Sequence, residues 1–222
     1  MKTKLIPLLA LLAILPFARA ADAAPCCAAC AADAKPAAEK SCCADETPAA
    51  AFTAKSLYQL DATWTNDAGQ PVRLASFHGH PVVVAMFFAS CEYACPIIVT
   101  EMKRLRDSLP ADVRAETRFV LVTFDSTRDT PAALAAYRER MQLDDAWTLL
   151  RGADADVQEL AMLLGVKYRQ DAKGQFSHSN LITILNPEGE IAHQRAGLEG
   201  DVGAAARAVT ATLATGRTIP NS

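Results

Sequence analysis

The chain has 222 residues, of which 51% are hydrophobic and 21% are charged, and its formal net charge at pH 7 is −3. This length is sufficient for one packed domain together with shorter segments. The mildly acidic charge balance argues against a nucleic-acid-binding surface, so no nucleic acid partner is expected.

The first twenty residues have the pattern of an export signal. Lys2 and Lys4 precede a short apolar run, and Ala18-Arg19-Ala20 provides a small-x-small cleavage motif. The apolar run is shorter than the roughly 20 residues that a membrane-spanning helix needs. We therefore predict a signal peptide over 1–20 and a soluble periplasmic protein. An uncleaved signal that anchors the chain while it faces the periplasm is the alternative.

Residues 21–55 are rich in alanine and proline and contain five of the seven cysteines. This composition cannot bury a core, so we predict a disordered tether. An odd number of cysteines cannot all pair within one chain, so some thiols must be free, shared between molecules or bound to metal. The tether cysteines are Cys26, Cys27, Cys30, Cys42 and Cys43.

From residue 56 onward the hydrophobic pattern alternates between strands and helices. Residues 58–77 predict a β-hairpin that turns at 67–69. Residues 81–88 and 118–124 are unbroken apolar runs, which is typical of central strands covered on both faces. Between these runs, apolar side chains recur on one face of a predicted helix, namely Ile98, Met102, Leu105 and Leu109.

Three helices and a second hairpin are predicted to follow. Residues 130–141 begin with a threonine cap and a proline, 154–166 have an acidic start, and 201–215 form the last helix. Residues 180–197 predict two strands around an Asn-Pro-Glu-Gly turn. The order predicts an α/β, thioredoxin-like fold over 56–216, with a central mixed sheet flanked by helices and an N-terminal β-hairpin. Residues 217–222 remain as a C-terminal tail.

Cys91 and Cys95 follow the first central strand, at the sheet edge where ligands collect in open α/β folds. Pro96 has no N–H and disfavours the helical conformation at Cys95, so we predict a helix that begins at Pro96 with Cys95 as its cap. Both sulfurs would then lie near a helix N-terminus, which favours thiolates. Thiolates either attack disulfides or bind metals, so this feature alone does not separate an exchanger from a metal carrier.

His178 helps to distinguish a metal carrier from a disulfide exchanger. A peroxiredoxin-like site would have threonine at the position of Phe88, and a thioredoxin-type exchanger would have a proline in the loop that contains His178. The strand after His178 is expected to run antiparallel to the central strand, which would bring His178 beside the two cysteines. His178 is then either the third ligand of a soft metal site, suited to Cu(I) and able to hold Cu(II), or a loop histidine without metal. His78 and His80 are expected to lie on the surface, and His193, in the last hairpin, is expected to have no role in the site.

Three stretches of the sequence together resemble the Sco/SenC family of copper-binding assembly proteins: "SCEYACP", "VTFDSTRDTP" and "FSHSNLITILNPEGEI". The resemblance covers most of residues 56–215. It implies a domain that binds one copper ion, as Cu(I) or Cu(II), through Cys91, Cys95 and His178. It also matches a family aspartate to Asp125, which either tunes the copper site from outside the ligand set or caps its own loop.

The resemblance implies a metallochaperone rather than an enzyme, which delivers copper to the dinuclear copper centre of cytochrome c oxidase. The implied partners are the copper-bearing subunit of the oxidase and another periplasmic copper chaperone. Membrane contact is expected only through a partner or an uncleaved signal. The main alternative is a thiol-disulfide oxidoreductase that keeps cysteines of the oxidase or of a copper chaperone reduced, because the spacing of Cys91 and Cys95 permits a disulfide. A redox or copper sensor is a third interpretation. The five tether cysteines either capture additional Cu(I) or form incidental disulfides.

Overall fold

The computed structural model describes residues 52–172 and 174–216. The predicted signal peptide at 1–20, the five tether cysteines and the tail at 217–222 lie outside these described residues. No helix in the described part of the chain is both long enough and apolar enough to cross a membrane.

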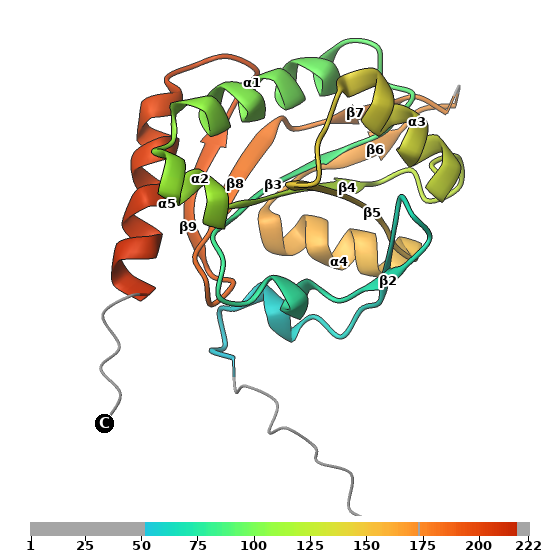
Figure 1. Ribbon diagram of the computed structural model, residues 1–222. Coiled ribbons are helices and arrows are strands. Elements are labelled where there is room, and N and C mark those ends of the chain that lie inside the picture. The colour runs from blue at the N-terminus through green and yellow to red at the C-terminus, as the bar shows by residue number, and fades with distance from the viewer. Residues whose placement is uncertain (1–51, 173, 217–222) are drawn as a thin grey trace, which may run out of the picture. The chain divides into compact units, whose positions relative to one another are not determined.

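A seven-stranded sheet forms the centre of the domain (Figure 1), with the strand order β2-β1-β5-β4-β3-β8-β9. The central strands β3, β4 and β5 are parallel, whereas β1, β8 and β9 each run antiparallel to a neighbour. The predicted mixed sheet with an N-terminal hairpin is therefore confirmed. The strands of this sheet are β1 Trp64–Asn66, β2 Pro71–Val72, β3 Val82–Phe87, β4 Arg118–Thr123, β5 Trp147–Arg151, β8 Leu181–Leu185 and β9 Ile191–Ala196.

The two predicted central strands lie at the middle of the sheet. Every residue of β3 is buried, and so is every residue of β4 after Arg118. Such burial on both faces requires helices above and below the sheet. The sequence pattern does not indicate β5, because its five residues form too short an apolar run to distinguish a strand from a helix. Pairing with β4 places it in the sheet.

Helices cover both faces of the sheet, with α1 and α3 above it and α4 below it in the view of Figure 1. The predicted start of α3 is confirmed, because the side chain of Thr130 accepts a hydrogen bond from the N–H of Ala133 at 3.3 Å, and Pro131 follows as the first helical residue. The short helix α2 was not predicted. The helices are α1 Ala94–Ser108, α2 Ala111–Glu116, α3 Pro131–Met141, α4 Asp154–Leu164 and α5 Val202–Gly216, with 3-10 turns η1 Leu57–Gln59 and η2 Leu74–Phe77.

A second, two-stranded sheet follows α4. It consists of β6 Tyr168–Gln170 and β7 Phe176–His178, which pair antiparallel so that Tyr168 lies opposite His178. The sequence predicted only a loop here, because each strand has three residues and neither has a long apolar run. This hairpin determines where His178 lies.

The segment that leads into β1 packs against the turn between β8 and β9. The N–H of Leu57 donates to the carbonyl of Gly189 at 2.9 Å, and the ring of Phe52 lies 5.6 Å from that of Tyr58. Gly189 has a φ of +82°, and a Cβ at this position would lie 2.6 Å from the ring of Tyr58. Both the left-handed backbone conformation and the lack of room for a Cβ therefore favour glycine at this position.

Substitution of Gly189→Ala is expected to lower the free energy of unfolding by about 2–4 kcal/mol, because left-handed strain and a steric overlap with Tyr58 act together. Denaturant unfolding measures this change. Gly69→Ala is the matched control, since Gly69 has a φ of +78° but no atom within 4 Å of the added Cβ. Equal losses for the two variants would show that the contact with Tyr58 has no effect on stability.

Candidate metal site

The two cysteines and one histidine singled out by the sequence lie together at one edge of the sheet. Cys91 is in the loop after β3, Cys95 is in the first turn of α1, and His178 ends β7. Their ligand atoms all lie within 4.8 Å of one another, and the distance from Cys95 Sγ to His178 Nε2 is 3.8 Å. This arrangement matches the geometry of a small site for a soft metal ion.

The direction of β8 explains this proximity. β8 pairs antiparallel with β3, and Ile182 near its start lies opposite Ala85 near the end of β3. His178 comes four residues before Ile182, so it is carried to the edge where β3 ends and Cys91 begins its loop. The predicted antiparallel direction is confirmed.

The helix that carries Cys95 begins at Ala94, with Tyr93 as its N-cap. The prediction that Pro96 is the first helical residue is therefore wrong. Pro96 is the third residue of the helix, where an N–H has no acceptor within the helix, so proline fits there without losing a hydrogen bond. The N–H of Cys95 instead donates to Cys91 Sγ at 3.3 Å. The Cys91 sulfur thus serves as an acceptor at the helix N-terminus.

The two sulfurs differ in their exposure. Cys95 is fully buried, whereas Cys91 is half-buried, and both are free thiols. Burial raises the pKa of the Cys95 thiol well above its ordinary value, and the nearby Cys91 adds to this rise. In the metal-free protein, burial of Cys95 therefore opposes the thiolate that the helix N-terminus was expected to favour.

His178 presents one ring nitrogen to the cysteines. Its Nδ1 donates a hydrogen bond to the carbonyl oxygen of Ser179 at 3.2 Å. Burial lowers the pKa of His178 below its ordinary value. The imidazole is therefore neutral at neutral pH, and the lone pair of Nε2 faces Cys95 Sγ, where a metal ion can take the place of the thiol proton.

Aromatic rings pack against the ring of His178. The ring of His178 lies 5.0 Å from that of Phe124 and 6.1 Å from that of Phe88, and Phe176 contacts both phenylalanines. These rings were not predicted to be neighbours of His178. Their closeness to the ligands in the sequence could have indicated this packing, since Phe88 precedes Cys91 by three residues and Phe176 precedes His178 by two.

The opposite side of the site opens into a cleft of about 550 Å³. Cys91 and His178 line this cleft together with Tyr93 and Gln175, and 74% of Tyr93 is exposed at its rim. Cys91 and His178 can therefore be reached from solution, while Cys95 is shielded beneath them.

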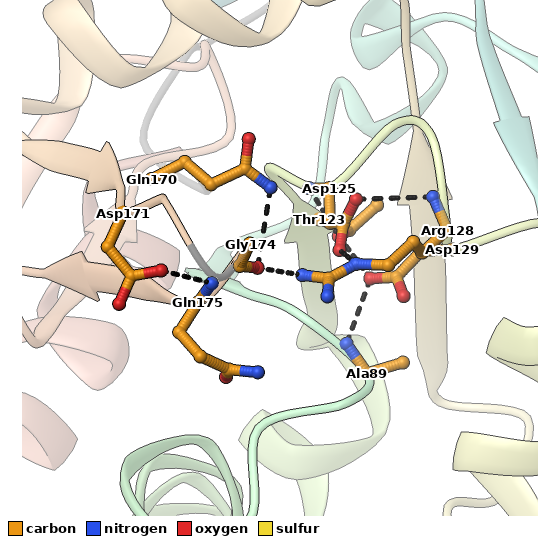
Figure 2. A network of polar contacts seen from close by, with 9 residues as sticks. All are labelled: Ala89, Thr123, Asp125, Arg128, Asp129, Gln170, Asp171, Gly174 and Gln175. Atoms are coloured by element: carbon orange, nitrogen blue, oxygen red, sulfur yellow. Dashed lines mark hydrogen bonds and ion pairs between the residues drawn. The ribbon is translucent and has the colours of Figure 1, made fainter.

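The turn after β4 contains the predicted aspartate. Asp125 is 3% exposed, accepts a hydrogen bond from the backbone N–H of Arg128 at 3.2 Å and forms an ion pair with its guanidinium. Asp129 accepts hydrogen bonds from the N–H of Ala89, at 2.8 Å, and from the hydroxyl of Thr123 (Figure 2). In the described part of the chain, Asp125 is not a member of the group of convergent metal-binding side chains.

The other three histidines lie elsewhere in the described residues. His78 is exposed, and the ring of His80, just before β3, lies 3.3 Å from the carboxylate of Glu116. His193 lies on β9. None of them belongs to a group of metal-binding side chains in the part of the chain that the structure describes.

The raised pKa of Cys95 leads to a prediction for metal binding. Near neutral pH the metal-free protein holds a proton on Cys95, and a metal binds the thiolate, so binding must release that proton. Copper affinity is therefore expected to rise with pH, by about tenfold per pH unit for each proton displaced. Competition titrations of Cu(I) between about pH 6 and about pH 8 measure this slope. An affinity independent of pH would contradict a protonated Cys95.

Comparisons with known proteins agree with this picture of the fold. A family model described as SCO1/SenC matches residues 52–214. A Stutzerimonas stutzeri protein that carries the provisional name copper-binding protein is 30% identical over 152 residues, which cover 66% of this chain and 72% of that protein.

Two solved structures have the same thioredoxin-like fold. Bradyrhizobium japonicum ScoI, with copper bound, is 20% identical, with a TM-score of 0.59, and the match covers 68% of this chain and 97% of that one. BsSco is described as a member of the Sco family of cytochrome c oxidase assembly proteins with a disulfide switch. It is 21% identical, with a TM-score of 0.59, and the match covers 68% of this chain and 91% of that one.

Proposed function

This chain belongs to the SCO1/SenC family, and we propose that it is a copper metallochaperone that delivers copper to the dinuclear centre of cytochrome c oxidase during assembly. The convergence of the ligand atoms of Cys91, Cys95 and His178 within 4.8 Å is the observation that carries this proposal. These three side chains would hold one copper ion in the folded domain.

The donor set favours copper over zinc. Two sulfurs and one imidazole nitrogen suit Cu(I), and the imidazole also allows Cu(II) to bind. A structural zinc site takes four protein ligands, whereas the group found among the described residues has three. Copper is also the metal of two relatives, since the Stutzerimonas stutzeri protein is named for copper binding and ScoI has copper bound.

The unequal exposure of the ligands suits delivery. Cys91 and His178 line an open cleft, so a ligand of a partner protein can approach the ion from that side while buried Cys95 still holds it. Copper can then pass by stepwise exchange of ligands. We propose the copper-bearing subunit of the oxidase as the acceptor and another periplasmic copper chaperone as the donor. BsSco is described as belonging to a family of oxidase assembly proteins, which supports this choice.

A transfer experiment tests the delivery function. The copper-loaded protein is mixed without oxygen with the metal-free copper domain of the oxidase subunit, the two are separated, and the copper content of each is measured. We expect copper to move to the oxidase domain and to form its dinuclear centre. Retention of all copper on the chaperone would contradict delivery.

A thiol-disulfide oxidoreductase is the second candidate. Cys91 and Cys95 are free thiols, Cys91 lines an open cleft, and BsSco is described as having a disulfide switch. Such an enzyme would reduce a disulfide in the oxidase subunit before metal loading. Incubation of the metal-free reduced protein with the oxidised oxidase domain, followed by thiol counting, tests this activity separately from copper transfer.

The tether supports a separate prediction about copper stoichiometry. Its cysteine doublets, Cys26-Cys27 and Cys42-Cys43, lie outside the described residues. We propose that they capture additional Cu(I), because soft thiolates bind this ion. Deletion of residues 21–50 is expected to lower the number of Cu(I) ions bound per chain while the site in the domain keeps its ion. Elemental analysis after gel filtration measures this number. An unchanged value would show that the tether cysteines do not capture copper.

The cellular location also belongs to this proposal. We propose that residues 1–20 direct export to the periplasm and are removed after Ala20. The N-terminal sequence of the mature protein is then expected to begin at Ala21. A mature protein that retains Met1 and fractionates with membranes would instead show an uncleaved anchor.

A further inference from the structure

The turn between β4 and α3 contacts both the loop that leads to Cys91 and the hairpin that ends at His178. Figure 2 shows its hydrogen bonds to Ala89 and Gly174. On one side, Asp129 accepts a hydrogen bond from the N–H of Ala89, in the short loop that leads to Cys91. On the other side, Arg128 reaches the hairpin that ends at His178. One turn of the chain therefore touches the loop of the cysteines and the hairpin of the histidine.

Arg128 makes two contacts with the hairpin. Its Nη2 donates a hydrogen bond to the carbonyl of Gly174, and its guanidinium carbon lies 5.9 Å from the centre of the Phe176 ring. The carbonyl of Gly174 also accepts a hydrogen bond from Gln170 Nε2 at 3.3 Å, so Arg128 holds the turn that joins β6 and β7. Phe176 is separated from His178 by one residue.

The guanidinium is itself fixed in place. Asp125, which is 3% exposed, pairs with Nε of Arg128 and also accepts a hydrogen bond from the backbone N–H of Arg128. Arginine can bind this carboxylate through Nε while Nη2 points to Gly174, because its donors form a planar fork. A lysine has a single ammonium group and cannot bind Asp125 and Gly174 in this way at the same time.

The hairpin needs such support. β6 and β7 pair with each other and form a sheet separate from the seven-stranded one, and an isolated two-stranded hairpin is marginally stable in water. The contacts of its side chains with the domain must therefore set its orientation. These contacts include the packing of Phe176 on Phe88 and Phe124 and the stacking of Tyr168 on Phe124. The backbone of the hairpin is held as well, because the carbonyl of Gly174 accepts a hydrogen bond from Arg128.

We propose that Arg128 is a positioning residue that, anchored by Asp125, holds the β6–β7 hairpin so that His178 stays beside the sulfurs of Cys91 and Cys95. The part of this inference that concerns copper rests on the proposed function. The part that concerns the hairpin does not depend on copper. Asp125 then acts on the site through Arg128 rather than by contact with the metal.

Hydrogen exchange of the metal-free full-length chain tests the hold on the hairpin. Arg128→Gln is expected to speed amide exchange in 168–178 by about tenfold or more, because a hydrogen bond from a charged donor is lost. Exchange in β3 and β8 should stay unchanged, which also shows that the domain is folded. Arg106→Gln is the matched control, because it removes an ion pair between Arg106 on α1 and Asp144 in the loop between α3 and β5, and it should leave the hairpin unchanged. Unchanged hairpin exchange in Arg128→Gln would overturn the proposal.

A double-mutant comparison tests the link to His178. Arg128→Gln is expected to weaken copper binding by about tenfold, because loss of a group that orients a metal ligand commonly has an effect of this size. In a chain that already has His178→Ala, the same change should have no further effect, because the residue it positions is gone. Arg128→Lys, which keeps the charge beside Asp125, should also weaken binding. Equal losses with and without His178 would overturn the positioning role. If the unchanged chain bound no copper, the proposed function would fail, and the exchange experiment would still decide the role of Arg128.

Discussion

Replacement of His178 by alanine is expected to lower the affinity of the protein for Cu(II) by more than about 100-fold, because loss of a ligand should exceed the 10–100-fold effect of losing an outer partner of a ligand. The affinity for Cu(I) is expected to fall less, since both soft thiolates remain. Competition titrations with each copper ion measure the two losses. The dithiol should still reduce a small disulfide substrate at the original rate.

His193→Ala is the control for this experiment, because His193 lies on β9 and does not belong to the group of convergent ligands. It should leave both copper affinities unchanged. If His178→Ala bound Cu(II) as tightly as the unchanged chain, a three-ligand site would be wrong, and the dithiol would be left with its redox chemistry alone.

Replacement of Cys95 by serine is expected to remove copper from the folded domain altogether. Serine is close to cysteine in size, so the fully buried position should stay packed, but its hydroxyl is a hard, weak donor for a soft ion. The measurement is copper per chain after gel filtration, in full-length protein whose five tether cysteines are also serine. The expected value falls from one ion to none.

Ser90→Ala is a suitable control for this second experiment. Ser90 lies beside Cys91 on the lining of the same cleft but does not belong to the group of convergent ligands. The variant should keep its copper ion. Full copper occupancy in Cys95→Ser would contradict the assignment of Cys95 as a ligand. A folded state should be verified by unfolding curves, because loss of the domain would also remove copper.

Much of the fold could be predicted because its long elements carry strong patterns. The run that became β3 is apolar throughout, the run that became β4 is apolar from Phe119 to Val122, and Thr130-Pro131 marks the start of α3 by well-understood capping chemistry. The elements that were missed are short. β6 and β7 have three residues each, and β5 is placed by its pairing with β4 rather than by its own pattern.

The site was predictable for a topological reason. An antiparallel β8 beside β3 was enough to bring His178 to Cys91 and Cys95, although more than eighty residues of chain separate Cys95 from His178. The start of α1 was not predictable from Pro96, because proline fits several positions in a first helical turn. The protonation of Cys95 was not predictable either, since it depends on a burial that only the packed structure supplies.

The residues that hold the ligands in position were the hardest to predict from the sequence. Arg128 follows Asp125 by three residues in the chain, and the structure shows that its side chain binds Gly174 in a distant hairpin. No local pattern indicates this contact, because it joins two turns that are 46 residues apart in the chain. The geometry of the site therefore depends on contacts that only the tertiary structure reveals.

The most direct test of the central claim is X-ray absorption at the copper edge of the copper-loaded chain, with the five tether cysteines replaced by serine. The account predicts two sulfur neighbours and one imidazole nitrogen around copper, from Cys91, Cys95 and His178. A spectrum without an imidazole contribution, or with fewer than two sulfurs, would contradict it.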